Sequence, residues 1–203
     1  MIALIDAGGA NLGSVRIALE RLGADVRIVR DADGLRDARA VILPGVGAAG
    51  TAMRLLRARG LDTALPELDA PLLGICLGMQ LLFDASEEQG AQCLGLLPGV
   101  VRALAPSPGI RVPHMGWNRL DARNSDPLLA GLAPDAQAYF VHGYAAPVTD
   151  ACIASATHGG PFAAVVRRGA ICGTQFHPER SGTVGARILR NFLAFADARR
   201  EAA

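Results

Sequence analysis

Cys76 is the residue of this sequence best suited to act as a nucleophile. It stands at the centre of Gly-Ile-Cys-Leu-Gly, residues 74–78, where an apolar run is followed by a helical pattern. Small residues two positions before and after it permit the sharp turn of a nucleophile elbow, which projects the central side chain outward. A helix N-terminus at this position favours thiolate over thiol. Its free backbone N–H groups, such as that of Leu77, can stabilise an oxyanion by donating hydrogen bonds to it. The pattern alone leaves open a buried structural cysteine, which is how we interpret the other three cysteines.

A histidine and a carboxylate that could serve this nucleophile lie near the other end of the chain. The segment Gly-Thr-Gln-Phe-His-Pro-Glu, residues 173–179, ends the last predicted strand. If it stays extended, the side chains of His177 and Glu179 project to the same face. The carboxylate would then fix the tautomer of the imidazole, which could take a proton from a thiol and return it to a leaving amine. Cys76, His177 and Glu179 thus supply the parts of a catalytic triad, although a surface histidine before a capping Pro-Glu is the alternative.

A glycine-containing turn offers a second group for oxyanion binding. Pro-Gly-Val-Gly, residues 44–47, directly follows the third predicted strand. Gly45 and Gly47 allow unusual dihedral angles around Val46, whose N–H could join that of Leu77 in an oxyanion hole. We expect this loop to have two backbone states and not to be preformed in the free chain. A plain strand-to-helix turn is the alternative, and a phosphate-binding loop is disfavoured because no Gly-Lys-Ser/Thr follows.

Short apolar strands that alternate with amphipathic helices must position these groups. This alternation favours a single α/β domain, residues 1–203, with a central, mostly parallel sheet flanked by helices. The second half has strand patterns without intervening helices, which predicts an antiparallel extension of that sheet. The predicted strands are residues 2–5, 26–29, 40–43, 71–75, 100–104, 138–141, 152–156, 163–166 and 171–176, and the predicted helices are residues 12–22, 50–60, 77–83 and 183–198.

Composition narrows the class of protein. The 203 residues are 51% hydrophobic and 19% charged, which is enough apolar material for a substantial core and argues against disorder. With a net charge of +1 and no basic block, neither nucleic acid nor an anionic membrane surface is favoured as a partner. No secretory signal and no segment of about 18 apolar residues is visible, so we expect a cytoplasmic protein. No histidine pair has metal-ligand spacing with supporting Cys or Asp, so we expect neither a metal nor another cofactor.

The motifs together resemble the signatures of the class I glutamine amidotransferases. Residues 44–47, 74–80 (Gly-Ile-Cys-Leu-Gly-Met-Gln) and 173–179 match three signatures of that family in order, across nearly the whole chain. The resemblance implies a γ-glutamyl thioester on Cys76, release of ammonia and hydrolysis to glutamate. A carboxylate twelve positions after the cysteine suits the α-ammonium group of the substrate. The residues that the resemblance places around the substrate glutamine are Gln80, Glu88, His142, Gly143 and Tyr144.

Within that family, the sequence is most similar to the glutaminase subunits of imidazole glycerol phosphate synthases, which act in histidine biosynthesis. The specific motif is Val-Pro-His-Met-Gly-Trp-Asn at residues 112–118, and residues 6–15 and 139–142 agree with it. The resemblance implies a heterodimer with a cyclase subunit that has a (β/α)8 barrel. That subunit would use the ammonia to make imidazole glycerol phosphate and an aminoimidazole carboxamide ribonucleotide. The residues implied to face the partner are Asn11, Trp117, Asn118, Tyr139 and Arg180, and an exposed Trp is a physically apt interface anchor.

Several residues depart from the family pattern. Ala7 and Ala10 stand where a tyrosine and a glycine are usual, and Gly143 and Ala145 replace residues of a usual Ser-Tyr-Tyr segment. Arg180 replaces a lysine, which keeps the charge and changes its geometry. None of these changes removes a member of the triad, so we expect them to affect affinity and coupling more than chemistry. The alternatives are a subunit that serves anthranilate or aminodeoxychorismate synthesis, a catalytically silent scaffold, and an unrelated cysteine hydrolase.

Overall fold

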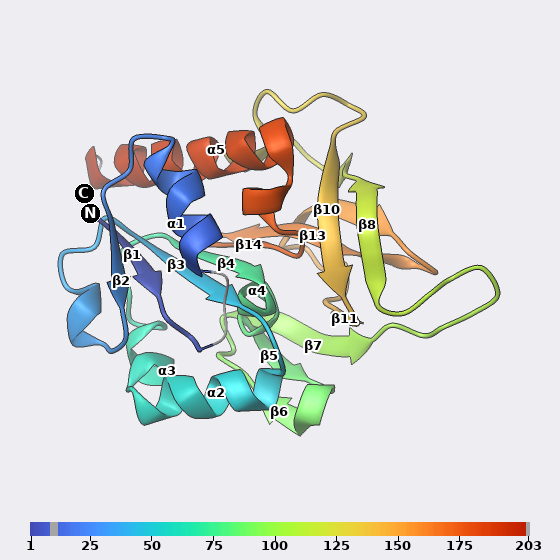
Figure 1. Ribbon diagram of the computed structural model, residues 1–203, viewed down its shortest axis with the longest axis horizontal. Coiled ribbons are helices and arrows are strands. Elements are labelled where there is room, and N and C mark those ends of the chain that lie inside the picture. The colour runs from blue at the N-terminus through green and yellow to red at the C-terminus, as the bar shows by residue number, and fades with distance from the viewer. Residues whose placement is uncertain (9–11, 202–203) are drawn as a thin grey trace.

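Eight strands form the central sheet of the computed structural model, which describes residues 1–8 and 12–201 (Figure 1). Their order is β2-β1-β3-β4-β14-β13-β12-β9, in which the first five are parallel and the last three are antiparallel. The prediction of a mostly parallel sheet with an antiparallel extension is confirmed. The strands are β1 Ile2–Ile5, β2 Val26–Val29, β3 Ala40–Gly45, β4 Leu72–Cys76, β9 Asp121–Ala122, β12 Cys152–Thr157, β13 Pro161–Arg168 and β14 Ile171–Thr174.

Helices cover both faces of this sheet (Figure 1). On one face lie α1 (Leu12–Glu20) and α5 (Gly182–Glu201), and on the other lie α2 (Ala49–Ala58) and α3 (Leu61–Ala64). Successive side chains of β1 point to opposite faces: Leu4 packs in the core with α1 and α5, and Ile5 packs in the core with α2 and α3. Burial on both faces explains why strands β1, β3 and β4 are continuous apolar runs in the sequence.

Two smaller sheets lie beside the central one. Strands β8 (His114–Arg119) and β10 (Gln137–His142) form an antiparallel pair, which we call the β8–β10 ribbon. The strand predicted over residues 138–141 is therefore confirmed, but it pairs in this ribbon and not in the central sheet. A four-stranded sheet has the order β11-β7-β5-β6. Its strands are β5 Phe83–Ser86, β6 Ala91–Gln92, β7 Leu97–Ala103 and β11 Tyr144–Ala145, and the 3-10 turns are η1 Asp33–Leu35, η2 Glu88–Gly90, η3 Pro127–Leu129 and η4 Pro178–Arg180.

The helix predicted over residues 77–83 is wrong in length. Helix α4 ends after one turn, at Leu77–Gln80, and Phe83 begins strand β5. The carbonyls of Leu81, Leu82 and Phe83 accept N–H groups from residues 94–97, and Phe83 pairs in parallel with Leu97. These long-range hydrogen bonds replace those of further helical turns, so tertiary pairing overrides the local pattern.

The other predicted helices agree with the structure apart from their ends. The last predicted helix continues to Glu201, three residues beyond the expected end. None of the helices within residues 12–201 is long and apolar enough to cross a bilayer. Two residues singled out in the sequence, Ala10 and Asn11, lie outside the described residues.

Candidate active site

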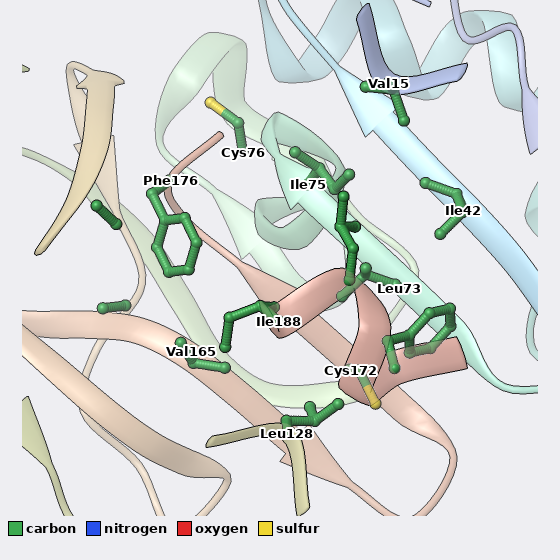
Figure 2. Close-up of a cluster of buried hydrophobic side chains, with 14 of the residues drawn as sticks. Val15, Ile42, Leu73, Ile75, Cys76, Leu128, Val165, Cys172, Phe176 and Ile188 are labelled. Atoms are coloured by element: carbon green, nitrogen blue, oxygen red, sulfur yellow. The ribbon is translucent and has the colours of Figure 1, made fainter. Parts of the chain in front are cut away.

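Cys76 occupies a strained turn between strand β4 and helix α4. Its backbone has φ 54° and ψ −112°, which non-glycine residues rarely adopt. The flanking glycines are required by space: a Cβ on Gly74 would lie 2.6 Å from the carbonyl oxygen of Gly78, and one on Gly78 would lie 1.8 Å from that of Leu43. Figure 2 shows the Cys76 sulfur pointing away from the apolar cluster that contains Ile75. The turn therefore has the geometry of a nucleophile elbow.

His177 and Glu179 meet, but not by the extended path considered from the sequence. His177 itself is extended, with φ −95° and ψ 98°, and the 3-10 turn η4 follows with Pro178 at its first position. The carbonyl of His177 closes this turn by accepting the Arg180 N–H at 3.0 Å and the Ser181 hydroxyl at 2.7 Å. The turn brings the Glu179 carboxylate back to the imidazole, with 2.9 Å between His177 Nδ1 and Glu179 Oε1.

The protonated form of His177 is strongly stabilised. Burial opposes the charge, but interactions with Cys76 and Glu179 outweigh it and raise the pKa of His177 to about 10. The Glu179 side chain is only 2% exposed, and its Oε2 atom is buried with no hydrogen-bond partner among the described residues. Since Nδ1 donates to this carboxylate, the other ring nitrogen is left for proton exchange with the cysteine. The three side chains can thus act as nucleophile, base and orienting carboxylate.

The turn over residues 44–47 lies beside Cys76 because of strand register. Gly45 ends β3 and pairs directly with Cys76 on β4. A Cβ on Gly45 would lie 2.8 Å from the backbone nitrogen of Gly78, so the close approach of the two segments requires glycine. Gly47 has φ +90°, and Val46 is partly exposed. Val46 and Leu77 follow these two paired residues, and both line a cavity together with Cys76. The expectation that this loop is not preformed stays a prediction.

A cavity of about 290 Å³ opens onto the sulfur, a volume suited to a small molecule. Its lining includes all five residues expected around the substrate, and Pro113 and Val141 also line it. Gly45 lies outside this lining, in a smaller cavity shared with Val46, His177 and Glu179. The expected residues that the large cavity brings together are Val46, Gly47, Cys76, Leu77, Gln80, Glu88, His142, Gly143, Tyr144 and His177.

Two polar side chains of the cavity lining, Gln80 and Glu88, and their buried neighbour Gln175 form hydrogen bonds around it. Gln80 is buried and donates from Nε2 to the Tyr144 carbonyl at 2.8 Å and to Gln175 Oε1 at 2.9 Å. Gln175 in turn places its Nε2 3.8 Å from the Cys76 sulfur. Sequence reasoning did not single out Gln175, although a polar residue in a buried run directly before the histidine was a usable signal. Glu88 accepts the Ala49 N–H at 2.7 Å and so ties the cavity rim to the start of α2.

The residues expected to face a partner divide into two groups. Trp117 is 56% exposed and stands edge-on to Tyr139, and the Arg180 guanidinium lies 5.4 Å from the centre of the Tyr139 ring. These three side chains form one surface cluster, in which Trp117 and Arg180 are exposed and Tyr139 is half-buried. The exposed apolar side chain of Met115 lies on the same strand as Trp117. Asn118 differs, because its amide turns inward and donates to the Thr157 carbonyl at 2.9 Å.

The family model of class-I glutamine amidotransferases matches residues 3–195. The chain belongs to this family. The imidazole glycerol phosphate synthase subunit HisH of Xanthomonas axonopodis pv. citri (strain 306) is 67% identical over 192 residues, which cover 95% of this chain and 96% of that protein. The subunit of the same name from Xylella fastidiosa (strain Temecula1 / ATCC 700964) is 62% identical with the same coverage. A crystal structure described as a glutamine amidotransferase has a TM-score of 0.76 at 24% identity, covering 97% of this chain and 98% of that one, and shows the shared fold.

Three departures from the amidotransferase pattern lie in the cavity wall or in the apolar cores. A Cβ on Gly143 would meet only Val112 Cγ1, at 3.9 Å, so space does not require glycine at this position. Ala7 and Ala145 are both buried and belong to the two apolar cores. No group of three or more His, Cys, Asp or Glu side chains that could hold a metal ion occurs within residues 1–8 and 12–201.

Proposed function

We propose that this chain is the glutaminase subunit of an imidazole glycerol phosphate synthase and releases ammonia from glutamine in histidine biosynthesis. One observation carries the proposal: a cysteine in a nucleophile elbow and a carboxylate-bound histidine meet at a cavity of small-molecule size. This arrangement occurs in an amidotransferase whose relatives named imidazole glycerol phosphate synthase subunit HisH are 62–67% identical over 95% of the chain. In this proposal residues 1–203 act as one domain.

The chemistry follows from the positions of the three side chains. His177 takes the proton of the Cys76 thiol as the sulfur attacks the carboxamide carbon of glutamine, and the carbonyl electron pair moves to oxygen, where the N–H groups of Leu77 and Val46 stabilise it. Collapse of this intermediate breaks the C–N bond while the His177 imidazolium donates its proton to the leaving nitrogen, so ammonia leaves and a thioester remains. Water then attacks the thioester as His177 takes its proton, and breakage of the C–S bond, with return of that proton to the sulfur, restores the thiol and releases glutamate. Glu179 holds the ring through Nδ1 in both halves of the reaction.

The cavity supplies groups that suit the substrate. The Glu88 carboxylate pairs with the α-ammonium group, and buried Gln80 holds the wall formed by His142, Gly143 and Tyr144. Gly45 and Gly47 give the oxyanion loop its two backbone states, of which only one presents the Val46 N–H. No cofactor takes part in this reaction.

The partner in this proposal is a cyclase subunit with a (β/α)8 barrel, which receives the ammonia in a heterodimer. Trp117, Tyr139 and Arg180 form an aromatic and cationic surface cluster of the kind that anchors interfaces. Asn11 and Asn118 complete the proposed interface. We place the pair in the cytoplasm, with no role for nucleic acid or membrane.

Glutamate release tests the proposal directly. We expect weak hydrolysis by the chain alone, a clear rise with the cyclase subunit and its nucleotide ligand, and no hydrolysis by Cys76→Ala under either condition. Hydrolysis that rises only with a different synthase would show that the pathway is wrong. If no partner elicits hydrolysis that depends on Cys76, the chain is a silent scaffold.

A further inference from the structure

Two buried histidines outside the proposed triad face each other across the β8–β10 ribbon. His114 and His142 are register partners of the two strands and are 5% and 6% exposed. Their rings lie 3.0 Å apart, measured from His114 Nδ1 to His142 Nε2. Only His142 borders the cavity, and the proposed chemistry passes no proton through either ring.

The hydrogen bonds of this pair have one possible direction when both rings are neutral. His142 Nδ1 lies 2.8 Å from the Tyr144 carbonyl, which can only accept, so Nδ1 carries the proton. The bare Nε2 of His142 then accepts from His114 Nδ1, which leaves His114 Nε2 bare. That atom accepts from the Asn118 amide at 3.3 Å. Burial supports the neutral forms, since it lowers the pKa of each histidine to about 4.

The chain of donors ends on a carbonyl of the cavity wall. The Tyr144 carbonyl accepts from His142 Nδ1 on one side and from Gln80 Nε2 on the other, both at 2.8 Å. Gln80, His142, Gly143 and Tyr144 all line the cavity that opens onto Cys76. Two donors therefore fix the direction of this peptide and with it the shape of the wall.

We propose that His114 is a positioning residue for glutamine binding, which acts through His142 on the Tyr144 carbonyl. This inference rests on the proposed glutaminase function and adds a residue that does not touch the substrate. Without the His114 donor, the Nε2 of His142 is a buried acceptor with no partner, and the ring is free to adopt its other tautomer. That tautomer has no N–H for the Tyr144 carbonyl, so the wall loses one of its two donors.

Two substitutions at position 114 separate positioning from packing. His114 stacks on Phe140 and His158, with ring centres 5.1 and 4.1 Å away. His114→Phe keeps an aromatic ring in this stack and removes the donor. His114→Asn loses the ring but places an amide N–H near the position of Nδ1. A packing role predicts that phenylalanine is the better replacement, whereas a positioning role predicts that asparagine is.

The experiment measures KM and kcat for glutamine hydrolysis by each variant in complex with the cyclase subunit. We expect His114→Phe to raise the KM for glutamine about tenfold with a much smaller change in kcat, since an unpaired buried acceptor costs about that factor. His114→Asn should recover most of the lost affinity. A matched control is His158→Phe, because His158 shares the stack but donates to the Arg111 carbonyl and not to this chain; we expect its KM to change less than twofold.

The outcomes distinguish this inference from the proposed function. A normal KM in His114→Phe, or equal increases in both variants, would overturn the role of His114 alone. Absence of hydrolysis by the unmodified chain with its partner would overturn the glutaminase function and this inference together. Nitrogen-15 NMR of the unmodified chain provides a readout that needs no folded variant: we expect protons on Nδ1 of both His114 and His142, and a proton on Nε2 of His142 would refute the chain of donors.

Discussion

Replacing Glu179 with glutamine would separate the charge of this carboxylate from its shape. The carboxylate accepts the His177 Nδ1–H at 2.9 Å, and its second oxygen is buried without a hydrogen-bond partner among the described residues. Glutamine keeps the volume and can still present an oxygen to the imidazole. What it removes is the negative charge that stabilises the imidazolium after proton transfer.

Catalysis and folding should respond differently to this change. A hydrogen bond to a charged group contributes about 1.5–3 kcal/mol and a neutral one about 1 kcal/mol, so the substitution removes about 0.5–2 kcal/mol. If this difference acts in the transition state, kcat falls roughly 2- to 30-fold. For folding, the loss is offset because an unpaired neutral amide costs less to bury than an unpaired carboxylate oxygen. We therefore expect the free energy of unfolding to change by less than about 1 kcal/mol.

Three measurements on Glu179→Gln check this reasoning. Steady-state glutamine hydrolysis with the cyclase subunit gives kcat, urea unfolding gives the stability, and an NMR titration should show a His177 pKa below its unmodified value of about 10. Glu179→Ala is the comparison, since it also opens a cavity and should lose more stability. An unchanged kcat together with a lowered His177 pKa would refute the role that we give to the carboxylate charge.

Three further predictions follow from other parts of the structure. Gly78→Ala should lower the free energy of unfolding by about 3 kcal/mol or more in urea titrations, because its Cβ would lie 1.8 Å from the Leu43 carbonyl oxygen. The free energy of unfolding should fall as the pH is lowered from 6.5 to 4. Burial lowers the pKa of His114 and His142 from the ordinary value of 6.5 to about 4, so the unfolded chain binds more protons than the folded chain in this range. Each histidine contributes up to about 1.4 kcal/mol per pH unit to the slope of the free energy of unfolding against pH. Urea unfolding from pH 7.5 to 4.5 measures this slope, and His114→Phe should reduce the combined slope of the two histidines by about half. Iodoacetamide should modify Cys76 first, as mass spectrometry would show, because burial raises the pKa of the other three thiols; earlier alkylation of any of them would contradict this.

The parallel half of the fold is well predicted from the sequence because its signals are local. Strands β1 and β2 have the expected bounds, and β3 and β4 differ from them by one or two residues at one or both ends. Strands β1, β3 and β4 are apolar runs of four to six residues, buried on both faces and followed by a turn or a helical pattern. The edge strand β2 contains Arg27 and has two exposed residues, but it is still a short run in which the other three residues are apolar. The nucleophile elbow could be found for the same reason, since its two glycines stand next to the residue that they serve.

Strand β8, outside this sheet, has a weak local signal. It covers a segment with a glycine at φ +132° and alternates exposed with buried or partly buried residues, and it was not among the strands predicted from the sequence. It becomes a strand because β10 supplies its hydrogen bonds from about twenty residues away. The short α4 has the same explanation, since residues 94–97 take the carbonyls that a longer helix would use. Pairing between distant segments decided both cases.

The site depends on that ribbon as much as on the central sheet. The sheet places Cys76, but the Tyr139 carbonyl of β10 accepts the His177 N–H at 3.1 Å, and the Tyr139 N–H donates to the Ser181 hydroxyl at 2.9 Å. The other end of β10 carries His142, which holds the cavity wall at Tyr144. One strand therefore fixes both the base and the wall of the glutamine cavity. Local motifs could reveal the three reacting side chains. The hydrogen bond between His142 and His114, in contrast, forms only after strands β8 and β10 have paired.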